Sequence, residues 1–293
     1  MAWDQISITV PHEFVEPISH VFERYGHGVG IQSLDETDAR ITTFMPSGSD
    51  SRLARIEIGV NLARSISPMG ELEILPLDNE TDWRNAWKEH FSILKITKTL
   101  VIKPSWIDYV PKGPELVIEI DPGFAFGTGY HPTTHSCLAL LEKHIETGFN
   151  VFDLGTGSGI LSIAASKLGA SSITGMDIDP LCIKAANQNA KMCKVSDNTE
   201  FFSGTLPSDK IVPNSYDCVV ANISSRIGIS KASDILNIIK PSGILILSGI
   251  INNQAIETKN HFAELANIEN DYWKDDWVTF LIRKAPSESI NHE

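Results

Sequence analysis

The first 75 residues show two kinds of hydrophobic spacing. Ile6, Ile8 and Val10 alternate with polar positions, which predicts a strand with one buried face, whereas Ile18 and Phe22 lie four residues apart, which predicts an amphipathic helix. By the same reading, we expect strands at 3–10, 29–34, 39–44 and 72–75 and helices at 14–25 and 52–65. The order βαββαβ predicts a small α+β domain of ferredoxin-like topology over residues 1–75.

A linker helix and a loop are predicted over residues 76–115. Trp83, Trp87 and Phe91 recur at every fourth position and form one stripe of a helix over residues 81–94. We interpret the stripe as a core between two domains, and a surface that grips a substrate is the alternative. A proline-rich stretch then predicts a loop that leads to the next strand.

From residue 116 to residue 293, short apolar segments alternate with helical ones. This alternation is typical of an α/β domain with a mostly parallel, Rossmann-like sheet. We expect strands at 116–120, 150–154, 172–176, 199–202, 218–221 and 243–248, and helices at 160–168, 180–193 and 227–239. The segments 268–273 and 278–283 are expected to form an antiparallel hairpin that closes the sheet.

The strand over residues 150–154 leads into a glycine-rich turn. The turn contains Gly155, Gly157 and Gly159, and the next strand leads to Asp177, 22 positions after Gly155. Glycines let the backbone turn sharply and approach a ligand closely, and the helix that follows presents free N–H groups. A carboxylate at the end of the second strand can accept hydrogen bonds from both ribose hydroxyls. The layout therefore predicts a site for a nucleoside cofactor.

The spacing of the glycines bears on which cofactor is bound. Dinucleotide sites use G-x-G-x-x-G, whereas this chain has the shorter G-x-G-x-G. A pyrophosphate requires the longer turn, and the shorter one suits S-adenosylmethionine, which carries no phosphate. We expect S-adenosylmethionine, with a dinucleotide or a turn without a ligand as the alternatives.

Two further segments are expected near the same edge of the sheet. Pro132 is typical of the first turn of a helix, which places Thr134 at a helix start, and Asn222 ends a predicted strand. His131 and His135 have the i, i+4 spacing of metal ligands on a helix, but the sequence has no H-E-x-x-H motif and no evident third ligand. We interpret these histidines as capping and packing residues and predict no metal site.

Composition and charge narrow the choice of partners. The chain of 293 residues has a formal net charge of −13, and residues 1–75 hold 11 acids and 5 bases, a net charge of −6. Such a charge argues against passive binding to nucleic acid and favours a basic partner, although many proteins are acidic without such a partner.

The sequence also indicates a compartment. No apolar run approaches the length of a membrane span, and the first residues lack the features of a signal peptide. The four cysteines are scattered without a C-x-x-C pair, which is typical of reduced thiols. We therefore expect a cytoplasmic protein that does not contact a membrane.

Three motifs together resemble one known family. They are D-P-G-x-A-F-G-T-G-x-H-P-T-T at 121–134, D-x-G-x-G-S-G-I-L at 153–161 and V-V-A-N-I at 219–223, and Trp83, Trp87 and Pro104-Ser105-Trp106 match as well. With these motifs the chain resembles the bacterial ribosomal protein L-eleven methyltransferases from Trp3 to Arg283. The first motif is the most specific, because methyltransferases in general lack it.

The resemblance implies a fold, a reaction and a set of site residues. The fold would be a class I methyltransferase domain over residues 116–293, preceded by a substrate-recognition domain at 1–75. The reaction would be methyl transfer from S-adenosylmethionine to lysine side chains or N-terminal α-amino groups of the basic ribosomal protein L-eleven. The family's cofactor contacts fall on Thr134, Gly155, Asp177 and Asn222, and we add Gly157 from the turn itself. Small departures from the family occur at Tyr130, Thr156 and Ser224-Ser225.

Several functional readings stay open beside this one. Asn222 could hold the substrate amine through its neutral amide, or it could only contact the cofactor. The chain could also methylate a lysine of a different protein, or it could bind the cofactor and the ribosome without catalysis. A nucleic-acid methyltransferase is disfavoured, because amino-directed members usually carry N/D-P-P-Y/F where this chain has Ala221-Asn222-Ile223. We expect a monomer that does not bind nucleic acid directly.

Overall fold

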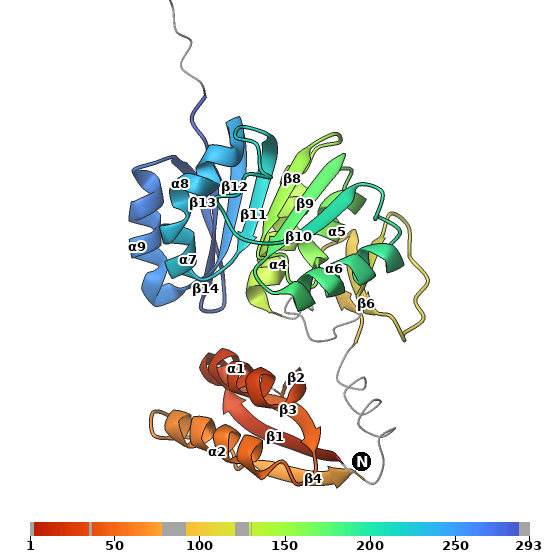
Figure 1. Ribbon diagram of the computed structural model, residues 1–293, viewed down its shortest axis with the longest axis vertical. Coiled ribbons are helices and arrows are strands. Elements are labelled where there is room, and N and C mark those ends of the chain that lie inside the picture. Colours follow the sequence, from red (N-terminus) through yellow and green to blue (C-terminus); the bar gives the residue numbers. More distant parts are fainter. Residues whose placement is uncertain (1–2, 35–36, 78–91, 121–128, 130, 287–293) are drawn as a thin grey trace, which may run out of the picture. The chain divides into compact units, whose positions relative to one another are not determined.

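The computed structural model describes residues 3–34, 37–77, 92–120, 129 and 131–286. The chain forms two compact units, Met1–Ser92 and Ile93–Glu293, called here the small unit and the large unit (Figure 1). The expected division into 1–75, 76–115 and 116–293 stays a prediction.

The small unit has the predicted βαββαβ order. Its elements are β1 (Trp3–Pro11), η1 (His12–Phe14), α1 (Val15–Tyr25), β2 (His27–Ser33), β3 (Asp38–Pro46), α2 (Asp50–Arg64) and β4 (Glu73–Leu77). The sheet order is β2-β3-β1-β4, and every neighbouring pair is antiparallel. This is the ferredoxin-like arrangement. The alternating Ile6, Ile8 and Val10 pack against Ile18 and Phe22 of α1, as their spacing predicts.

The large unit is built on a mostly parallel seven-stranded sheet. Its strands are β8 (Asn150–Leu154), β9 (Ser172–Asp177), β10 (Thr199–Ser203), β11 (Tyr216–Asn222), β12 (Ile239–Ile251), β13 (Asn267–Lys274) and β14 (Trp277–Arg283). Their order is β10-β9-β8-β11-β12-β14-β13. The first five strands are parallel, and β14 runs antiparallel to both β12 and β13. The predicted α/β fold, with its closing hairpin, is confirmed.

Helices cover both faces of this sheet (Figure 1). One face carries α4 (Pro132–His144), α5 (Ile160–Lys167) and α6 (Pro180–Met192), and the other carries α7 (Ser225–Ser230), α8 (Ala232–Ile238) and α9 (Asn252–Ala263). The core under α4, α5 and α6 is called here the first core, and the core on the other face is called the second core. Successive residues of one strand enter different cores: Val151 lies in the first core and Phe152 in the second core. Burial on both faces explains why these strands read as continuous apolar runs.

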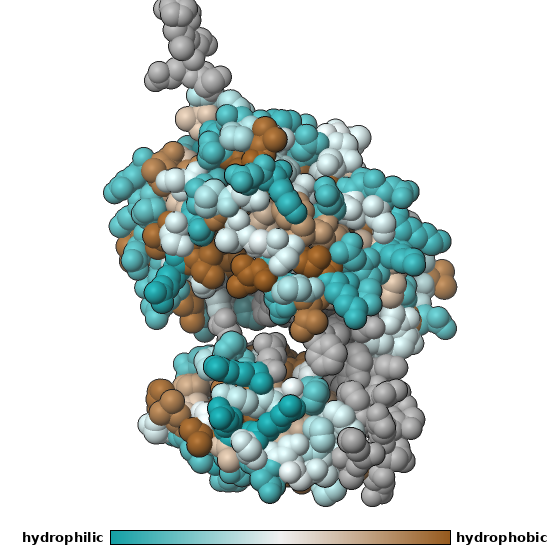
Figure 2. Space-filling model, in the orientation of Figure 1, coloured by the Kyte–Doolittle hydropathy of each residue, from teal (hydrophilic) through white to brown (hydrophobic). Residues whose placement is uncertain are grey.

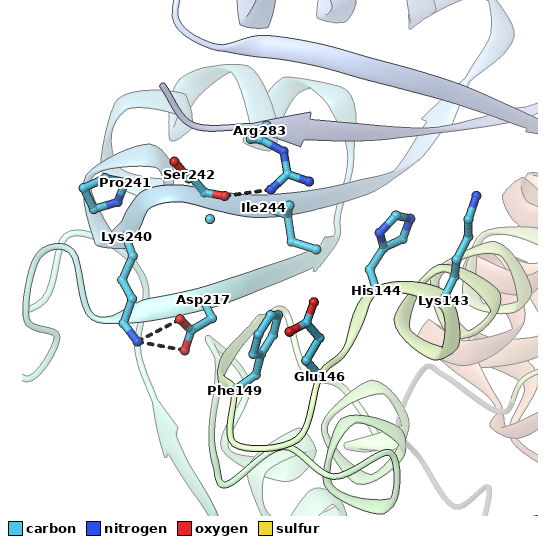
Figure 3. Close-up of a pocket in the computed structure, with 11 residues that line it drawn as sticks. Lys143, His144, Glu146, Phe149, Asp217, Lys240, Pro241, Ser242, Ile244 and Arg283 are labelled. Atoms are coloured by element: carbon cyan, nitrogen blue, oxygen red, sulfur yellow. Dashed lines mark hydrogen bonds and ion pairs between the residues drawn. The ribbon is translucent and has the colours of Figure 1, made fainter. Parts of the chain in front are cut away.

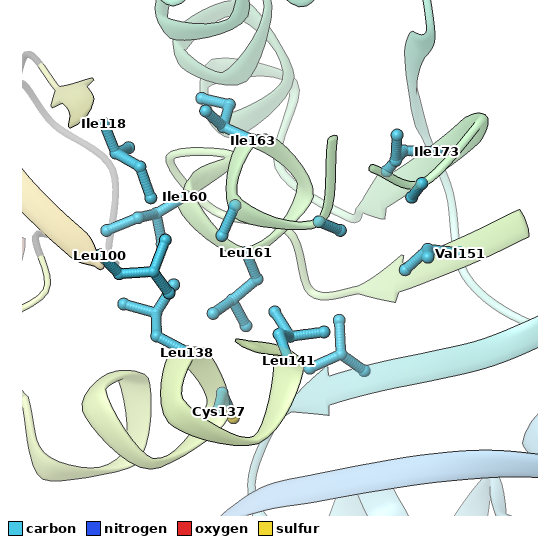
Figure 4. Close-up of a cluster of buried hydrophobic side chains, with 14 of the residues drawn as sticks. Leu100, Ile118, Cys137, Leu138, Leu141, Val151, Ile160, Leu161, Ile163 and Ile173 are labelled. Atoms are coloured by element: carbon cyan, nitrogen blue, oxygen red, sulfur yellow. The ribbon is translucent and has the colours of Figure 1, made fainter. Parts of the chain in front are cut away.

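A second, three-stranded sheet completes the first core. It contains β5 (Leu94–Lys95), β6 (Leu100–Pro104) and β7 (Leu116–Ile120), of which only β7 was predicted. Figure 4 shows Leu100 and Ile118 beside Leu138 of α4 and Ile160 of α5. The strands β5 and β6 occupy residues for which a helix end and a loop were predicted. The stripe of Trp83, Trp87 and Phe91 lies outside the described residues.

Two differences concern helices in the second core. The helix predicted at 227–239 is two helices, because the backbone leaves the helical region at Lys231 (φ −109°, ψ 7°) and Ile239 already belongs to β12. The break lets Ala232 and Ile235 pack into the core. The helix α9 was not predicted, since its buried face includes Thr258, whose hydroxyl is hydrogen-bonded to Ser225.

The start of α4 is fixed by His131. Its Nδ1 atom accepts a hydrogen bond from the backbone N–H of Thr133 at 3.3 Å, and Pro132 is the first helical residue. The ring also packs edge-on against Trp277, with 4.8 Å between ring centroids. The interpretation of His131 as a capping and packing residue is confirmed. Burial lowers the pKa of His131 from 6.5 to about 4, so the imidazole is neutral and able to accept this bond.

We predict that His131 makes folding sensitive to acid. The unfolded chain takes up this proton near pH 6.5 and the folded chain only near pH 4, so stability is complete above pH 6.5 and is lost as the pH falls toward 4. A shift from 6.5 to about 4 corresponds to roughly 3 kcal/mol. His131→Asn keeps a capping oxygen and cannot titrate, so urea unfolding should show a smaller loss between pH 7 and pH 4 than in the wild type. Other titrating groups are shared by the two proteins and cancel. A stability difference that does not change with pH would contradict this role.

Candidate functional site

The glycine-rich turn lies at the carboxyl end of β8. Gly155, Gly157 and Gly159 all have positive φ values, of 74°, 53° and 80°. A Cβ atom on Gly159 would lie 3.0 Å from Ala186 of α6, so the turn is held close to the neighbouring helix. The backbone conformation that the sequence predicts for this turn is therefore present, and it excludes larger side chains.

A buried carboxylate holds the turn in place. Asp153 is fully buried, and its Oδ2 atom accepts hydrogen bonds from Thr156 Oγ1 at 2.7 Å, Ser162 Oγ at 2.7 Å and the Ser162 N–H at 3.1 Å. These bonds join the end of β8 to the turn and to the first turn of α5. Burial raises the pKa of Asp153 to about 6, and its Oδ1 atom has no hydrogen-bond partner among the described residues.

Asp153 is a site residue that sequence reasoning missed. An acid inside the apolar run Val151–Leu154 is the signal that could have drawn attention to it, because buried acids are rare unless they are hydrogen-bonded. The structure also explains Thr156, which departs from the family. This departure from the family supplies one of the three hydrogen bonds to the buried carboxylate.

Asp177 lies beside the turn, as predicted. Its Oδ2 atom accepts from the Gly157 N–H and its Oδ1 atom from the Asp179 N–H, both at 3.0 Å. The residue is partly exposed. A carboxylate has roughly four acceptor positions, so two hydrogen bonds leave room for two hydroxyl donors. The remaining acceptor positions of the carboxylate and its partial exposure fit a ribose with adjacent hydroxyls.

Thr134 and Asn222 come together from distant parts of the chain. Asn222 ends β11 and donates from Nδ2 to Thr134 Oγ1 of α4, with 3.4 Å between the two atoms. Thr134 is buried and Asn222 is partly exposed. Among the described residues, the side-chain oxygen Oδ1 of Asn222 has no hydrogen-bond partner. It is therefore available to accept a hydrogen bond from a ligand or substrate.

The loop after Asn222 is fixed by the end of β12. The Ile223 N–H donates to Ser248 O at 3.0 Å, and Gly249 has a φ of 83°. A Cβ atom on Gly249 would lie 2.5 Å from the carbonyl oxygen of Ile223, so only glycine allows this approach. Gly155 faces the same residue, since its Cβ would lie 2.8 Å from Ile223 Cγ2. Gly155 and Gly249 therefore both approach the residue that follows Asn222.

A cavity of about 230 Å³ lies at the opposite, amino-terminal end of the sheet (Figure 3). Its wall includes Phe149, Asp217 and Lys240, which precede or begin strands, and Arg283 at the end of β14. Three of its charged groups are in ion pairs: Lys240 with Asp217 at 2.8 Å, and Arg283 with Glu269. None of the predicted site residues lines it, so it is separate from the candidate site.

Parts of the sequence prediction lie outside the described residues. These are residues 121–128 and Tyr130 of the first motif. Over the residues that are described, no group of three or more His, Cys, Asp or Glu side chains could hold a metal ion. Within the same part of the chain, no helix is long and apolar enough to span a membrane.

Comparison with known proteins gives a consistent result. The family model described as "Ribosomal protein L11 methyltransferase (PrmA)" matches residues 2–285. A protein of that name from Herpetosiphon aurantiacus is 34% identical over 322 aligned positions, which cover 97% of this chain and 99% of the relative. The namesake from Bacillus cereus is also 34% identical, over 97% of this chain and 100% of its own.

A solved structure agrees. The crystal structure of the ribosomal protein L11 methylase from Lactobacillus delbrueckii subsp. bulgaricus is 31% identical and superposes with a TM-score of 0.62. The match covers 67% of this chain and all of that one. With the sheet order described above, these matches establish both the family and the fold. This chain belongs to the ribosomal protein L11 methyltransferase (PrmA) family and is an S-adenosylmethionine-dependent class I methyltransferase.

Proposed function

We propose that this chain methylates lysine side chains, the N-terminal α-amino group, or both, of ribosomal protein L11 in the cytoplasm. The observation that carries the proposal is the convergence of Gly155, Asp177, Thr134 and Asn222 at one edge of the sheet, in a chain that matches the family along nearly its whole length. The relatives named above carry the substrate in their names. The direct test is mass spectrometry of ribosomal proteins from cells with and without this chain. L11 should lose methyl groups when the chain is absent, and an unchanged L11 would refute the proposal.

We propose the following roles in cofactor binding. Bound S-adenosylmethionine supplies a methyl group on an activated sulfonium. Asp177 accepts hydrogen bonds from the ribose hydroxyls, and Gly155 and Gly157 let the backbone lie against the amino-acid end. Thr134 and Asn222 form the neighbouring wall. Asp153 lies beneath the turn and positions it, without direct contact with the ligand.

The main chemical difficulty is the substrate amine. A lysine amine with a pKa near 10.4 is neutral in only about one molecule in 2,500 at pH 7, which corresponds to roughly 4.6 kcal/mol. A neutral acceptor can hold the amine by one N–H and stabilises the charged ammonium form much less than a carboxylate would. Asn222 has this character. Its Nδ2 donates a hydrogen bond to Thr134, and among the described residues its Oδ1 has no donor, so it can accept a hydrogen bond from the amine. A role limited to cofactor contact is the competing reading.

The sequence departs from the family at Ser224-Ser225. Of these two residues, Ser225 is not positioned to contact the substrate. This side chain is buried and its hydroxyl is bonded to Thr258 of α9 at 2.6 Å. It joins α7 to α9 and has a structural role.

The small unit is proposed to recognise the protein substrate. All the residues assigned to the cofactor lie in the large unit, and the acidic excess of residues 1–75 (11 acids and 5 bases) favours a basic partner.

The first prediction of this proposal concerns the cofactor. S-adenosylhomocysteine should bind in isothermal titration and NAD should not. Asp177→Ala should weaken binding of S-adenosylhomocysteine by about 1.5–3 kcal/mol, the range for hydrogen bonds that involve a charged group. Asp179→Ala is the matched control, because Asp179 caps α6 through the Leu181 N–H, and it should have a smaller effect. NAD binding without S-adenosylhomocysteine binding would contradict the assignment.

A second prediction separates the two readings of Asn222. Asn222→Asp is nearly isosteric, but its carboxylate would favour the ammonium form of the substrate. If the amide positions the amine, turnover should fall more than cofactor affinity does, and the defect should ease as the pH rises from 7 to 10. We would measure turnover of both proteins at saturating cofactor across this range. A ratio of mutant to wild-type rates that does not vary with pH would rule out the amine-positioning role.

A third prediction concerns the division of labour between the units. Removal of residues 1–92 should leave affinity for S-adenosylhomocysteine nearly unchanged and abolish methylation of L11. Circular dichroism would show whether the truncated protein is folded. A folded large unit that methylates L11 at the full rate would show that the small unit is not needed for recognition.

A further inference from the structure

Three arginines gather at one end of the small unit. Arg24 lies in the last turn of α1, and Arg52 and Arg55 lie in the first two turns of α2. The guanidinium carbons of Arg24 and Arg55 each lie 5.6 Å from the ring centroid of Tyr25. The Tyr25 ring is thus in cation–π contact with both side chains.

Arg52 is held by a different aromatic group. Its Nη1 atom lies 3.2 Å from Nε2 of His27, whose ring packs edge-on against Trp3 with 5.1 Å between centroids. Burial lowers the pKa of His27, and the charge of Arg52 lowers it further. The imidazole is therefore neutral at pH 7 and can accept the hydrogen bond from the guanidinium. All three guanidiniums are thus oriented by rings, which reduces the entropy lost when they bind a ligand.

These arginines differ from the other two bases of residues 1–75. Arg40 is paired with Glu73, and Arg64 with Glu71 at 3.1 Å. No ion pair with a described residue is found for Arg24, Arg52 or Arg55, and all three are exposed. Residues 1–75 hold 11 acids and 5 bases, and three of those bases lie together without an ion pair to a described residue. The arrangement leaves positive charge available to a partner.

The same side of α2 exposes aliphatic residues. Ile58 and Leu62 follow Arg55 at i+3 and i+7, and both are 68% exposed. Figure 2 shows exposed hydrophobic residues over α2 at the left of the small unit. Apolar side chains beside oriented arginines are typical of a protein interface rather than a nucleic-acid surface. The net charge of residues 1–75, −6, would also repel an extended polyanion.

We propose that Arg24, Arg52 and Arg55, called here the arginine cluster, bind a carboxylate side chain on the protein substrate. This inference rests on the proposed function of the small unit. The substrate is basic overall and is attracted by the acidic enzyme, and an acid on its surface is then held by the cluster. The overall attraction between the acidic enzyme and the basic substrate brings the two together. The local ion pair, in which the enzyme supplies the positive charge and the substrate the negative one, then fixes the orientation in which the substrate docks.

Charge reversal in the full-length chain tests this inference. We would measure kcat and KM for purified ribosomal protein L11, and the affinity for S-adenosylhomocysteine, in Arg52→Glu and Arg55→Glu. The KM for L11 should rise by about tenfold or more, while cofactor affinity stays unchanged. Arg24→Glu provides a further charge reversal, which removes one ring contact, and should raise the KM for L11 in the same way if one of the other variants folds poorly. Restoration of a low KM by an acid-to-lysine change on L11 would identify the partner carboxylate.

Lys191→Glu is the matched control. Lys191 is exposed in the last turn of α6 and has no ion pair with a described residue. Lys191→Glu changes the net charge by the same amount as each cluster variant. Added negative charge attracts the basic substrate at long range, so the KM of this control should equal the wild-type value or lie below it. A rise in KM confined to the cluster supports the inference, and equal KM values in cluster and control variants overturn it.

The outcomes distinguish this inference from the proposed function. If the wild-type chain does not methylate L11, the proposed function fails. If it does and the cluster variants keep the wild-type KM, only the arginine cluster is wrongly assigned. Binding of a ribosomal RNA fragment that is lost in these variants while KM is unchanged would assign the cluster to RNA and overturn the inference.

Discussion

The buried carboxylate of Asp153 is the interaction on which the candidate site depends. A fully buried acid is unfavourable unless donors surround it, and Thr156 and Ser162 supply three hydrogen bonds to one of its oxygens. These bonds fix the turn that follows β8. With the turn fixed, the Gly157 N–H points at Asp177 and orients the carboxylate proposed to hold the ribose. Asp153 thus sets the geometry of the site through its hydrogen bonds to the turn, without direct contact with a ligand.

The topology of the sheet explains why the other residues meet there. The chain winds from β8 through β9 to β10 on one side, and then returns to place β11 next to β8. Ligands in such sheets bind at the carboxyl ends of the strands where the order reverses. Here that point lies between the turn after β8 and Asn222 at the end of β11, with Gly249 of β12 pressed against Ile223. The cavity at the amino ends of the strands has no such convergence, and its ion pairs tie the strand ends together.

Much of this fold could be predicted because its signals are local. The parallel strands are buried on both faces and read as short apolar runs, and the glycine turn has a fixed spacing. The strands β5 and β6 were missed because they pack onto α4 and α5 through contacts distant in sequence. The break at Lys231 and the helix α9 were missed for a similar reason, since their buried faces are chosen by the sheet and by the Ser225–Thr258 pair.

The site shows the same division. Asp177 and the glycines could be predicted from spacing, whereas Asp153, Gly249 and the Asn222–Thr134 bond depend on how the strands pack. The central claim is that this carboxyl edge holds S-adenosylmethionine. The most direct measurement is a crystal structure with S-adenosylhomocysteine. The account predicts ribose hydroxyls on Asp177 and the amino-acid end beside Gly155. A ligand seated elsewhere, such as the cavity beside Lys240 and Arg283, with Asp177 still bound only to its backbone donors, would contradict it.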